Sequence, residues 1–474
     1  MTGGGVVADE VTTLNYLVNS LNSCRPTLER YDAYLEGEQP IRFLAPALQR
    51  EFGDRITALI LNFPRMIVDG AVPRLRIEGF RYAGDSSGDQ ALWDVWQAND
   101  MDEQSNQAHT DSLGLSRSYV IVGSGDSPDD HPVVTVESPL QVYAQRDPRT
   151  RRVIRAVKRW DEGELLQGPL ERHAVLYLPD STRHMVHGKD GWQVTGKVDK
   201  HEMGRVPVVP LVNRPRILRP DGISEFHDIL GLADAVNKLA TDMMVSAEYH
   251  AMPRRWAAGL TEKDFKDEAG NDLSAWSRDA GTLWATVNEK ASFGQFSEAD
   301  LTNFHTTIKV LAQFIISSAK LPQHYSPYSS GDANPTSADA LRVAETQYIT
   351  WLEGDKQVNL GGGWEDVNRL VLRVMTGKFD PKAQSLETVW RNAAAVTSAQ
   401  QADAALKLAS PIQGGRAIVP LEQTRIDLGY TPEQRLRMAE MDREAEQDPY
   451  LRDLAAKEAA VSTDGAEPAA PVVG

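Results

Sequence analysis

Two stretches of regularly spaced apolar residues on either side of a short insert constrain this fold more than any other feature of the sequence. Apolar residues recur every three or four positions from 224 to 250, which predicts a helix about 40 Å long that ends before Pro253. A second helix is expected over residues 300–320, because Pro322 disfavours helical backbone in the residue before it. The sequence therefore predicts two long helices that enclose a small, tryptophan-containing insert over residues 254–296.

The first half of the chain contains a helical part followed by a strand-rich part. Helical spacing from Val11 to Leu35 follows a frayed start, and an apolar stripe from Ile56 to Phe63 is interrupted by Pro64. From Leu115 onward, short runs between Gly, Pro and Asp clusters predict antiparallel strands. The expected strands cover residues 118–123, 133–137, 141–145, 153–160, 174–178 and 191–196.

The part after the second long helix begins with a loop and returns to helix. Residues 322–336 contain three prolines and show no strand or helix periodicity. A third helix is expected with Ser337 as its N-cap, and Gly361–Gly363 breaks or kinks its path. After Pro381 the chain is alanine-rich and is expected to be helical, whereas the tail beyond Lys457 has too little apolar surface to order. The whole pattern predicts an α+β fold.

Composition limits the class of protein. The chain has 474 residues and a formal net charge of −17, and its one cysteine, Cys24, cannot form an internal disulfide, which fits a reducing compartment. The start has no signal-peptide pattern and no run approaches 18 apolar residues. The acidity works against nonspecific adhesion to nucleic acid, but an acidic wall suits a conduit that DNA slides past.

The motifs that resemble catalytic or metal sites are weak. The sequence has no G-x-x-x-x-G-K-[ST] phosphate loop and no G-x-S-x-G elbow. His184 and His187 lack a third ligand, and His201 has no second histidine four residues on, so surface histidines are favoured. The strongest metal-like cluster is Asp126, Asp129, Asp130 and His131, which is interpreted first as a solvated turn and is retained as the candidate site of a metal-dependent hydrolase.

A basic segment covers residues 146–159 and contains seven Lys or Arg residues. Val153, Ala156, Val157 and Trp160 lie between the charges. This alternation favours a half-solvated strand over a DNA-binding site.

Several short strings, taken in order, resemble the portal proteins of tailed phages, particularly the siphophage type of actinobacteriophages. Each string alone is weak, and the resemblance rests on their order around two long helices that enclose an insert. The strings are Glu137–Tyr143, the residues around Asp147-Pro148, Gly204–Asn213, Asp234–Lys238, His250–Trp256 and Ser337–Leu341.

The resemblance implies a portal fold with a mixed α/β wing, a long-helix stem, a small clip insert and a helical crown. The implied divisions are a disordered start at 1–10, a wing at 11–221, stem helices at 222–251 and 298–321, a clip at 252–297, a tunnel loop at 322–336, a long kinked wing helix at 337–380, a crown at 381–456 and a disordered tail at 457–474.

The resemblance also implies a function without catalysis, metal or cofactor. Family members form dodecameric rings at the capsid vertex, assembled in the host cytoplasm, through which double-stranded DNA is packaged and ejected without sequence specificity. The implied partners are the terminase large subunit, the head-to-tail adaptor, and the major capsid and scaffolding proteins, with no membrane. The expected tunnel-loop residues are Gln323, His324, Tyr325, Ser326, Tyr328 and Asn334, and the expected docking residues of the clip are Arg254, Arg255, Trp256, Trp276, Arg278 and Trp284. A monomeric helical interaction scaffold is a further alternative.

Overall fold

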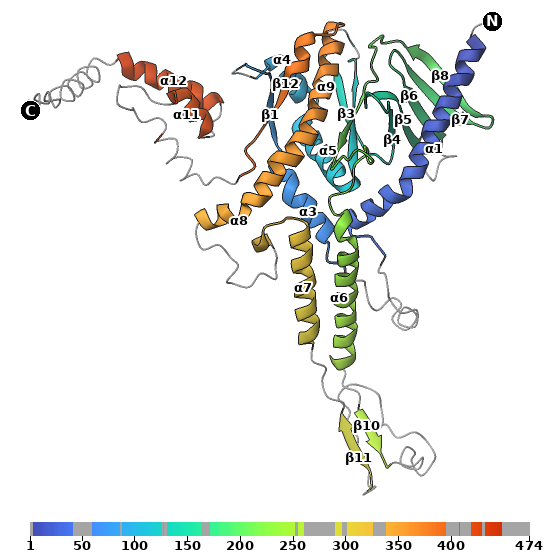
Figure 1. Cartoon of the computed structure of the whole chain (residues 1–474), viewed down its shortest axis with the longest axis vertical. Helices are drawn as coiled ribbons and strands as arrows, with labels where there is room; N and C mark the ends of the chain where they lie inside the picture. The colour runs from blue at the N-terminus through green and yellow to red at the C-terminus, as the bar shows by residue number, and fades with distance from the viewer. Residues whose placement is uncertain are drawn as a thin grey trace, which may run out of the picture. The chain divides into compact units, whose positions relative to one another are not determined.

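The computed structural model separates into two compact units, residues 1–394 and 395–474 (Figure 1). The structure describes residues 3–40, 59–85, 88–125, 127, 130–162, 171–251, 255–259, 290–295, 301–325, 338–394, 407, 419–428 and 432–447.

The first unit opens with helix α1 (Gly3–Glu36), which packs on a five-stranded sheet. Leu14 and Leu17 are fully buried against that sheet, and Glu10 forms an ion pair of 2.8 Å with Arg183 of strand β7 (Thr182–Gly188). The prediction of a disordered start over residues 1–10 is therefore wrong from Gly3 onward, because this helix continues outward from a buried contact.

Pro64 lies in the first turn of a helix, whereas the sequence pattern predicts that it interrupts one. Asn62 is the N-cap of α3 (Phe63–Ala71), and its side chain accepts a hydrogen bond from the backbone N–H of Arg65 at 3.0 Å. Proline is favoured in the first turn, where its missing N–H would have no helical partner. The helical elements that follow are the 3₁₀ turn η1 (Val72–Arg74), α4 (Gln90–Ala98) and α5 (Met101–Leu115).

The strands form three antiparallel sheets and a separate hairpin. One sheet has the order β3-β2-β9, another the order β4-β5-β6-β7-β8, and a third pairs β1 with β12. The strands are β1 (Ile77–Tyr82), β2 (Arg117–Gly123), β3 (Val133–Glu137), β4 (Val142–Arg146), β5 (Val153–Glu162), β6 (Glu171–Tyr177), β7, β8 (Gly191–Asp199), β9 (Val208–Val212) and β12 (Leu386–Trp390).

The strand-rich part that the sequence predicts from residue 118 is confirmed, but four strands of the three sheets were not expected, nor was the separate hairpin. The four strands are β1, β7, β9 and β12. Strand β12 follows the 3₁₀ turn η8 (Pro381–Ser385) and pairs with β1 in the register Phe80–Thr388. The expectation of helix directly after Pro381 is therefore wrong for this segment, whose backbone hydrogen bonds are made to a strand about 300 residues earlier.

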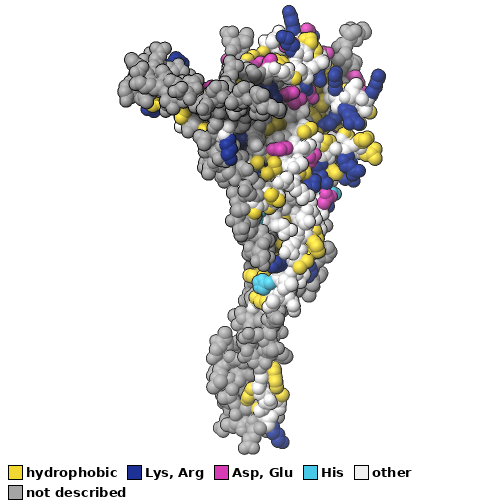
Figure 2. All heavy atoms as spheres, turned by 60° about the vertical axis from the view of Figure 1, so that its left-hand side comes forward, with side chains coloured by type: hydrophobic (Ala, Val, Ile, Leu, Met, Phe, Trp, Pro, Cys, Tyr) yellow, Lys and Arg dark blue, Asp and Glu magenta, His cyan; other side chains and the backbone are white. Residues whose placement is uncertain are grey.

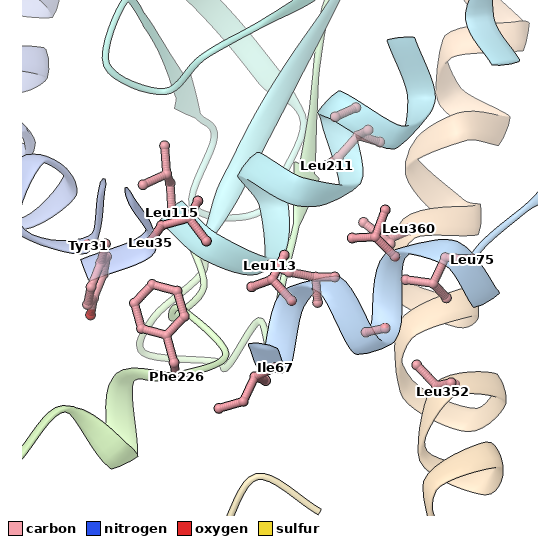
Figure 3. Packing of buried hydrophobic residues seen from close by; sticks show 14 of the residues in the cluster. Tyr31, Leu35, Ile67, Leu75, Leu113, Leu115, Leu211, Phe226, Leu352 and Leu360 are labelled. Atoms are coloured by element: carbon pink, nitrogen blue, oxygen red, sulfur yellow. The ribbon is translucent and has the colours of Figure 1, made fainter. Parts of the chain in front are cut away.

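The main core lies where the helices of the first part of the chain meet the three-stranded sheet and the long C-terminal helix of the first unit. Figure 3 shows how these side chains interdigitate around Leu113 and Phe226. The labelled residues come from segments far apart in the sequence and include Tyr31, Leu35, Ile67, Leu75, Leu115, Leu211, Leu352 and Leu360. One continuous core thus fixes the root of the long helices to the body of the unit.

The two long helices are confirmed. The 3₁₀ turn η2 (His227–Ile229) leads into α6 (Leu230–Ala251), and α7 is formed by Thr302–Ser318. Figure 1 shows them side by side, with the hairpin of β10 (Arg255–Ala258) and β11 (Ser292–Gln295) beyond their far end. We refer to α6 and α7 as the stem pair.

The third long helix runs through the glycine triplet. It consists of α8 (Ala338–Trp351), a π-helical segment η7 (Leu352–Gln357) and α9 (Val358–Thr376). The break considered at Gly361–Gly363 is absent, and the departure from α-helix occurs in η7. A Cβ atom on Gly363 would lie 2.4 Å from Cδ2 of Leu211, so this glycine permits close packing of α9 on β9.

In the second unit, the structure describes α11 (Leu421–Asp427) and α12 (Pro432–Gln447). Arg425 on α11 donates to Asp442 on α12 at 2.5 Å, which joins the two helices. No helix among the described residues of either unit is both long and apolar enough to span a bilayer.

Candidate functional site at the stem pair and the loop that follows it

The first stem helix is anchored to the body by buried polar side chains. Tyr34 of α1 donates a hydrogen bond of 2.6 Å to Asp234, and the backbone N–H of Leu61 donates one of 2.8 Å to Asn237. Asp234 and Asn237 are both buried, and both belong to the string that carries part of the portal resemblance. The buried end of α6 is therefore held by specific hydrogen bonds as well as by apolar packing.

Further along, the stem pair exposes large apolar side chains. Met244 on α6 is 50% exposed, and Val310 and Phe314 on α7 are 41% and 56% exposed. Val310 and Phe314 are four residues apart and so lie on the same face of α7. Figure 2 shows apolar side chains along the stem. An apolar surface of this kind is typical of a site that another protein surface covers.

The hairpin beyond the stem pair carries two of the predicted docking residues, Arg255 and Trp256. Trp256 pairs with Gly294 across the two strands, and a Cβ on Gly294 would lie 2.4 Å from Cε2 of the indole, so the ring lies over the glycine. Trp256 and Phe293 are 40% and 41% exposed. Arg255 pairs with Gln295 through its strand position, and the other predicted residues, Arg254, Trp276, Arg278 and Trp284, lie outside the described residues.

The start of the loop that follows α7 contacts a buried ion pair. Arg74 of η1 donates to both carboxylate oxygens of Glu345 on α8, at 3.1 and 3.2 Å, and Glu345 is only 5% exposed. Burial alone would lower the pKa of Arg74, but the hydrogen bond and the charge of Glu345 leave this pKa raised. The two hydrogen bonds have the paired geometry that is strongest for a guanidinium and a carboxylate.

Two predicted tunnel-loop residues are part of this cluster. Tyr325, in the 3₁₀ turn η5 (Gln323–Tyr325), accepts a hydrogen bond of 2.6 Å from Arg74, and His324 Nε2 lies 3.3 Å from a carboxylate oxygen of Glu345. Burial raises the pKa of Tyr325, so its hydroxyl stays protonated at neutral pH. Gln323 is exposed, and Ser326, Tyr328 and Asn334 lie outside the described residues. The described start of the loop is therefore bound to the body.

A second buried ion pair lies farther along the same helix. The ammonium of Lys356, in the π-helical segment η7, is 2.5 Å from Glu225 and 2.6 Å from the side-chain oxygen of Asn213. The Lys356 and Glu225 side chains are 1% and 8% exposed, and the ammonium also lies 4.7 Å from the centre of the Trp351 ring. Glu225 lies two residues before η2, which leads into α6, so Lys356 ties the third long helix to the segment that leads into the stem pair.

Sequence reasoning did not identify Arg74, Glu345, Glu225 or Lys356. A charged residue in a helix is usually solvated, and these pairs join residues more than 100 positions apart. One feature of the sequence pointed to burial of Lys356, because it lies four residues after Leu352 on the buried side of the expected long helix. That feature does not identify Glu225 as its ion-pair partner.

The histidine and aspartate motifs of the sequence gain no third metal ligand among the described residues. No group of three or more His, Cys, Asp or Glu side chains is placed there to hold a metal ion. Asp130 accepts a hydrogen bond from the backbone of Ser127 at 2.8 Å, and Asp126 and Asp129 lie outside the described residues. His184 and His187 are exposed on β7 and lie opposite Thr195 and Trp192 of β8.

Comparison with known proteins places the chain in a family. Residues 14–447 match the family described as phage portal protein, SPP1 Gp6-like. The chain is 29% identical over 448 residues to the portal protein of Mycobacterium phage L5, covering 92% of this chain and 89% of that protein. It is 30% identical over 454 residues to the portal protein of Mycobacterium phage D29, covering 94% and 91%. A chain of the neck of a native GTA particle, computed with C12 symmetry, superposes with a TM-score of 0.44 at 11% identity, covering 82% of this chain and 93% of that one.

The match over most of the chain, together with these two relatives, defines the class as the phage portal proteins. Among these proteins, the chain belongs to the SPP1 Gp6-like family. The expected family and fold class are confirmed.

Proposed function

We propose that this chain is one subunit of a closed dodecameric ring at the capsid vertex of the virion, through which double-stranded DNA is packaged and ejected. The number twelve and the vertex come from the resemblance to portal proteins. The observation that supports the ring is the apolar surface of the stem pair, with Phe314 56% exposed on a helix whose opposite face is buried. A cyclic ring requires one face of each subunit to cover a different face of the next.

The ring is tested by adding a charge to the apolar surface. In Phe314→Glu the carboxylate would have to be buried between subunits, so closed rings should be lost in negative-stain images and in native mass measurements. Gln313→Glu is the matched control, because it adds the same charge at the neighbouring exposed position of α7. Unchanged thermal unfolding would show that both variants fold. Rings of wild-type mass from Phe314→Glu would contradict the proposal.

The loop of residues 322–336 is the proposed tunnel loop, in which Gln323, Tyr328 and Asn334 touch the DNA backbone together with His324, Tyr325 and Ser326. Its anchorage at Arg74 and Glu345 supports this role, because a loop that meets moving DNA needs a fixed root. Deletion of residues 326–334 should leave rings intact and impair packaging or DNA retention. Full packaging by such rings would sink the proposal.

The hairpin is the proposed docking surface for the terminase large subunit and, after packaging, for the head-to-tail adaptor. Trp256 and Phe293, both exposed, support this role. The protein itself is proposed to have no catalytic activity, and the terminase supplies ATP hydrolysis. Major capsid and scaffolding proteins complete the set of partners, with assembly in the host cytoplasm. Trp256→Ala should weaken adaptor binding in a pull-down while rings persist, and unchanged adaptor binding after disruption of the whole insert would refute the assignment.

A further inference from the structure

A groove rich in arginine lies in the first unit, away from the stem pair. It has a volume of about 870 Å³ and opens between the β4–β5 turn, β9 and α9. Six arginines from segments far apart in the sequence line it: Arg146, Arg151, Arg152, Arg205, Arg369 and Arg373. Asp366 is the one acidic side chain among the described lining residues. In a chain with a net charge of −17, such a concentration of positive charge requires an explanation.

Most of this charge is not neutralised within the described part of the chain. Arg369 is paired with Asp366 at 2.8 Å and with Glu365 at 3.3 Å. In contrast, Arg152, Arg205 and Arg373 form no ion pair with any described residue. Burial lowers the pKa of Arg205, and the charges of Arg152, Arg369 and Arg373 lower it further against the opposing effect of Asp366. Like charges held together in a partly enclosed groove favour the binding of an anion.

We propose that this groove binds phosphate groups of a nucleic-acid backbone without sequence preference. The planar guanidinium presents paired donors that match the oxygens of a phosphate, and the described lining contains arginine and no lysine. Phe379 is the one aromatic side chain of that lining, so the groove offers little surface on which bases could stack. Contacts to phosphates position a nucleic acid but do not read its sequence.

An acidic peptide is the competing ligand, and the strand that lines the groove disfavours it. Strand β9 is at the edge of the sheet with order β3-β2-β9, and an extended peptide would bind by adding a strand to that edge. Pro210 lies in the middle of β9, and proline has no N–H to donate to an added strand. A ligand that needs only the guanidinium groups is therefore favoured.

The basic segment of the sequence is thus explained in two parts. Strand β5 is confirmed, with Ala156 and Val157 buried, as a half-solvated strand requires. Arg146, Arg151 and Arg152 lie at its turn and meet Arg205 and the arginines of α9 only in the folded chain. The sequence pattern predicts the strand, but it gives no sign that Arg205, Arg369 and Arg373 lie close to the turn before β5.

The proposal adds a nucleic-acid contact to which the stem pair and the proposed tunnel loop contribute no described lining residue, and it does not require a closed ring. Figure 2 shows that Lys and Arg side chains gather on the body of the first unit, with few along the stem. Binding to the groove can be measured on the purified full chain in any assembly state. A failure of the ring and a failure of the groove are therefore separate results.

The test is a titration of labelled duplex DNA, followed by fluorescence anisotropy, with the double variant Arg205→Gln/Arg373→Gln. Affinity is expected to fall by roughly tenfold or more, and the salt dependence of log K to become shallower by about 2, because two phosphate contacts are lost. Inorganic phosphate should compete with the DNA, and poly-glutamate should not.

The matched control is Arg81→Gln/Arg391→Gln, which removes the same charge at two exposed positions. Equal thermal stability of the two double variants excludes misfolding as the cause. The proposal is overturned if the control loses as much affinity as the groove variant, if wild-type protein does not bind DNA, or if poly-glutamate binds more tightly than DNA.

Discussion

Replacement of Lys356 by methionine should destabilise the first unit by a predictable amount. The variant keeps most of the side-chain volume but leaves Glu225 nearly buried without its cation, 2.5 Å from where the ammonium was. The amide of Asn213 still donates to Glu225 at 3.0 Å, but this group carries no charge. Removal of one partner of a buried ion pair costs about 3–5 kcal/mol. With an unfolding entropy of about 2.1 cal/mol/K per residue, a unit of this size should lose about 4–6 °C in Tm.

Differential scanning calorimetry of Lys356→Met, Glu225→Gln and the double variant measures this effect. The double variant should be more stable than the sum of the single losses implies, because neither charge is then left alone. Lys238→Met is the matched control, since Lys238 forms a partly exposed pair with Asp242 on α6 and its loss should cost less than about 1 kcal/mol. If Lys356→Met lowers Tm no more than Lys238→Met does, the buried pair does not stabilise the fold as argued.

Three further substitutions test other buried features. Burial raises the pKa of Asp111 from 3.8 to about 6, so the folded state loses stability as the pH rises from 3.8 through 6. Asp111→Asn should therefore raise the free energy of unfolding in urea by up to about 3 kcal/mol at pH 7 and have little effect at pH 4. Burial lowers the pKa of His109 from 6.5 to about 3, so the stability of the folded state falls as the pH drops below 6.5. In the same assay His109→Gln should lose less stability over this pH range than the wild type. An unchanged pH profile would contradict this prediction. Gly363→Ala should lower stability by about 1–3 kcal/mol, because the added Cβ would collide with Leu211. Gly362→Ala is the control and should not lower stability, because its Cβ position faces open space. Equal changes in Tm for the two variants would refute the packing argument.

Local periodicity was enough to predict the long helices and half of the described strands. The apolar positions of α6 and α7 repeat at helical spacing, and the runs that became β2 to β5 lie between turn residues. These patterns are set by which side of an element faces the core, and so they are visible without knowing its neighbours.

Features that depend on distant partners were not predictable in this way. The five residues of β12 form a strand because they pair with β1, and nothing in their own sequence excludes a helix. Gly361–Gly363 looks like a break, but Gly363 allows α9 to approach Leu211, and composition cannot separate these two uses of glycine. The same limit applies to Glu345 and Lys356, whose burial follows from Arg74 and Glu225 and not from their neighbours in the chain.

The two buried ion pairs connect one helix both to the start of the loop after α7 and to the segment that leads into α6. Glu345 and Lys356 are eleven residues apart on the continuous helix formed by α8 and η7. Glu345 holds Arg74 and Tyr325 at the start of the loop, and Lys356 holds Glu225 at the start of α6. A shift of the loop root relative to the stem pair must therefore either break a buried pair, at a cost of several kcal/mol, or carry this helix and both pairs with it. Because the second course avoids that cost, movements of the proposed tunnel loop and of the stem pair should be coupled through α8 and η7.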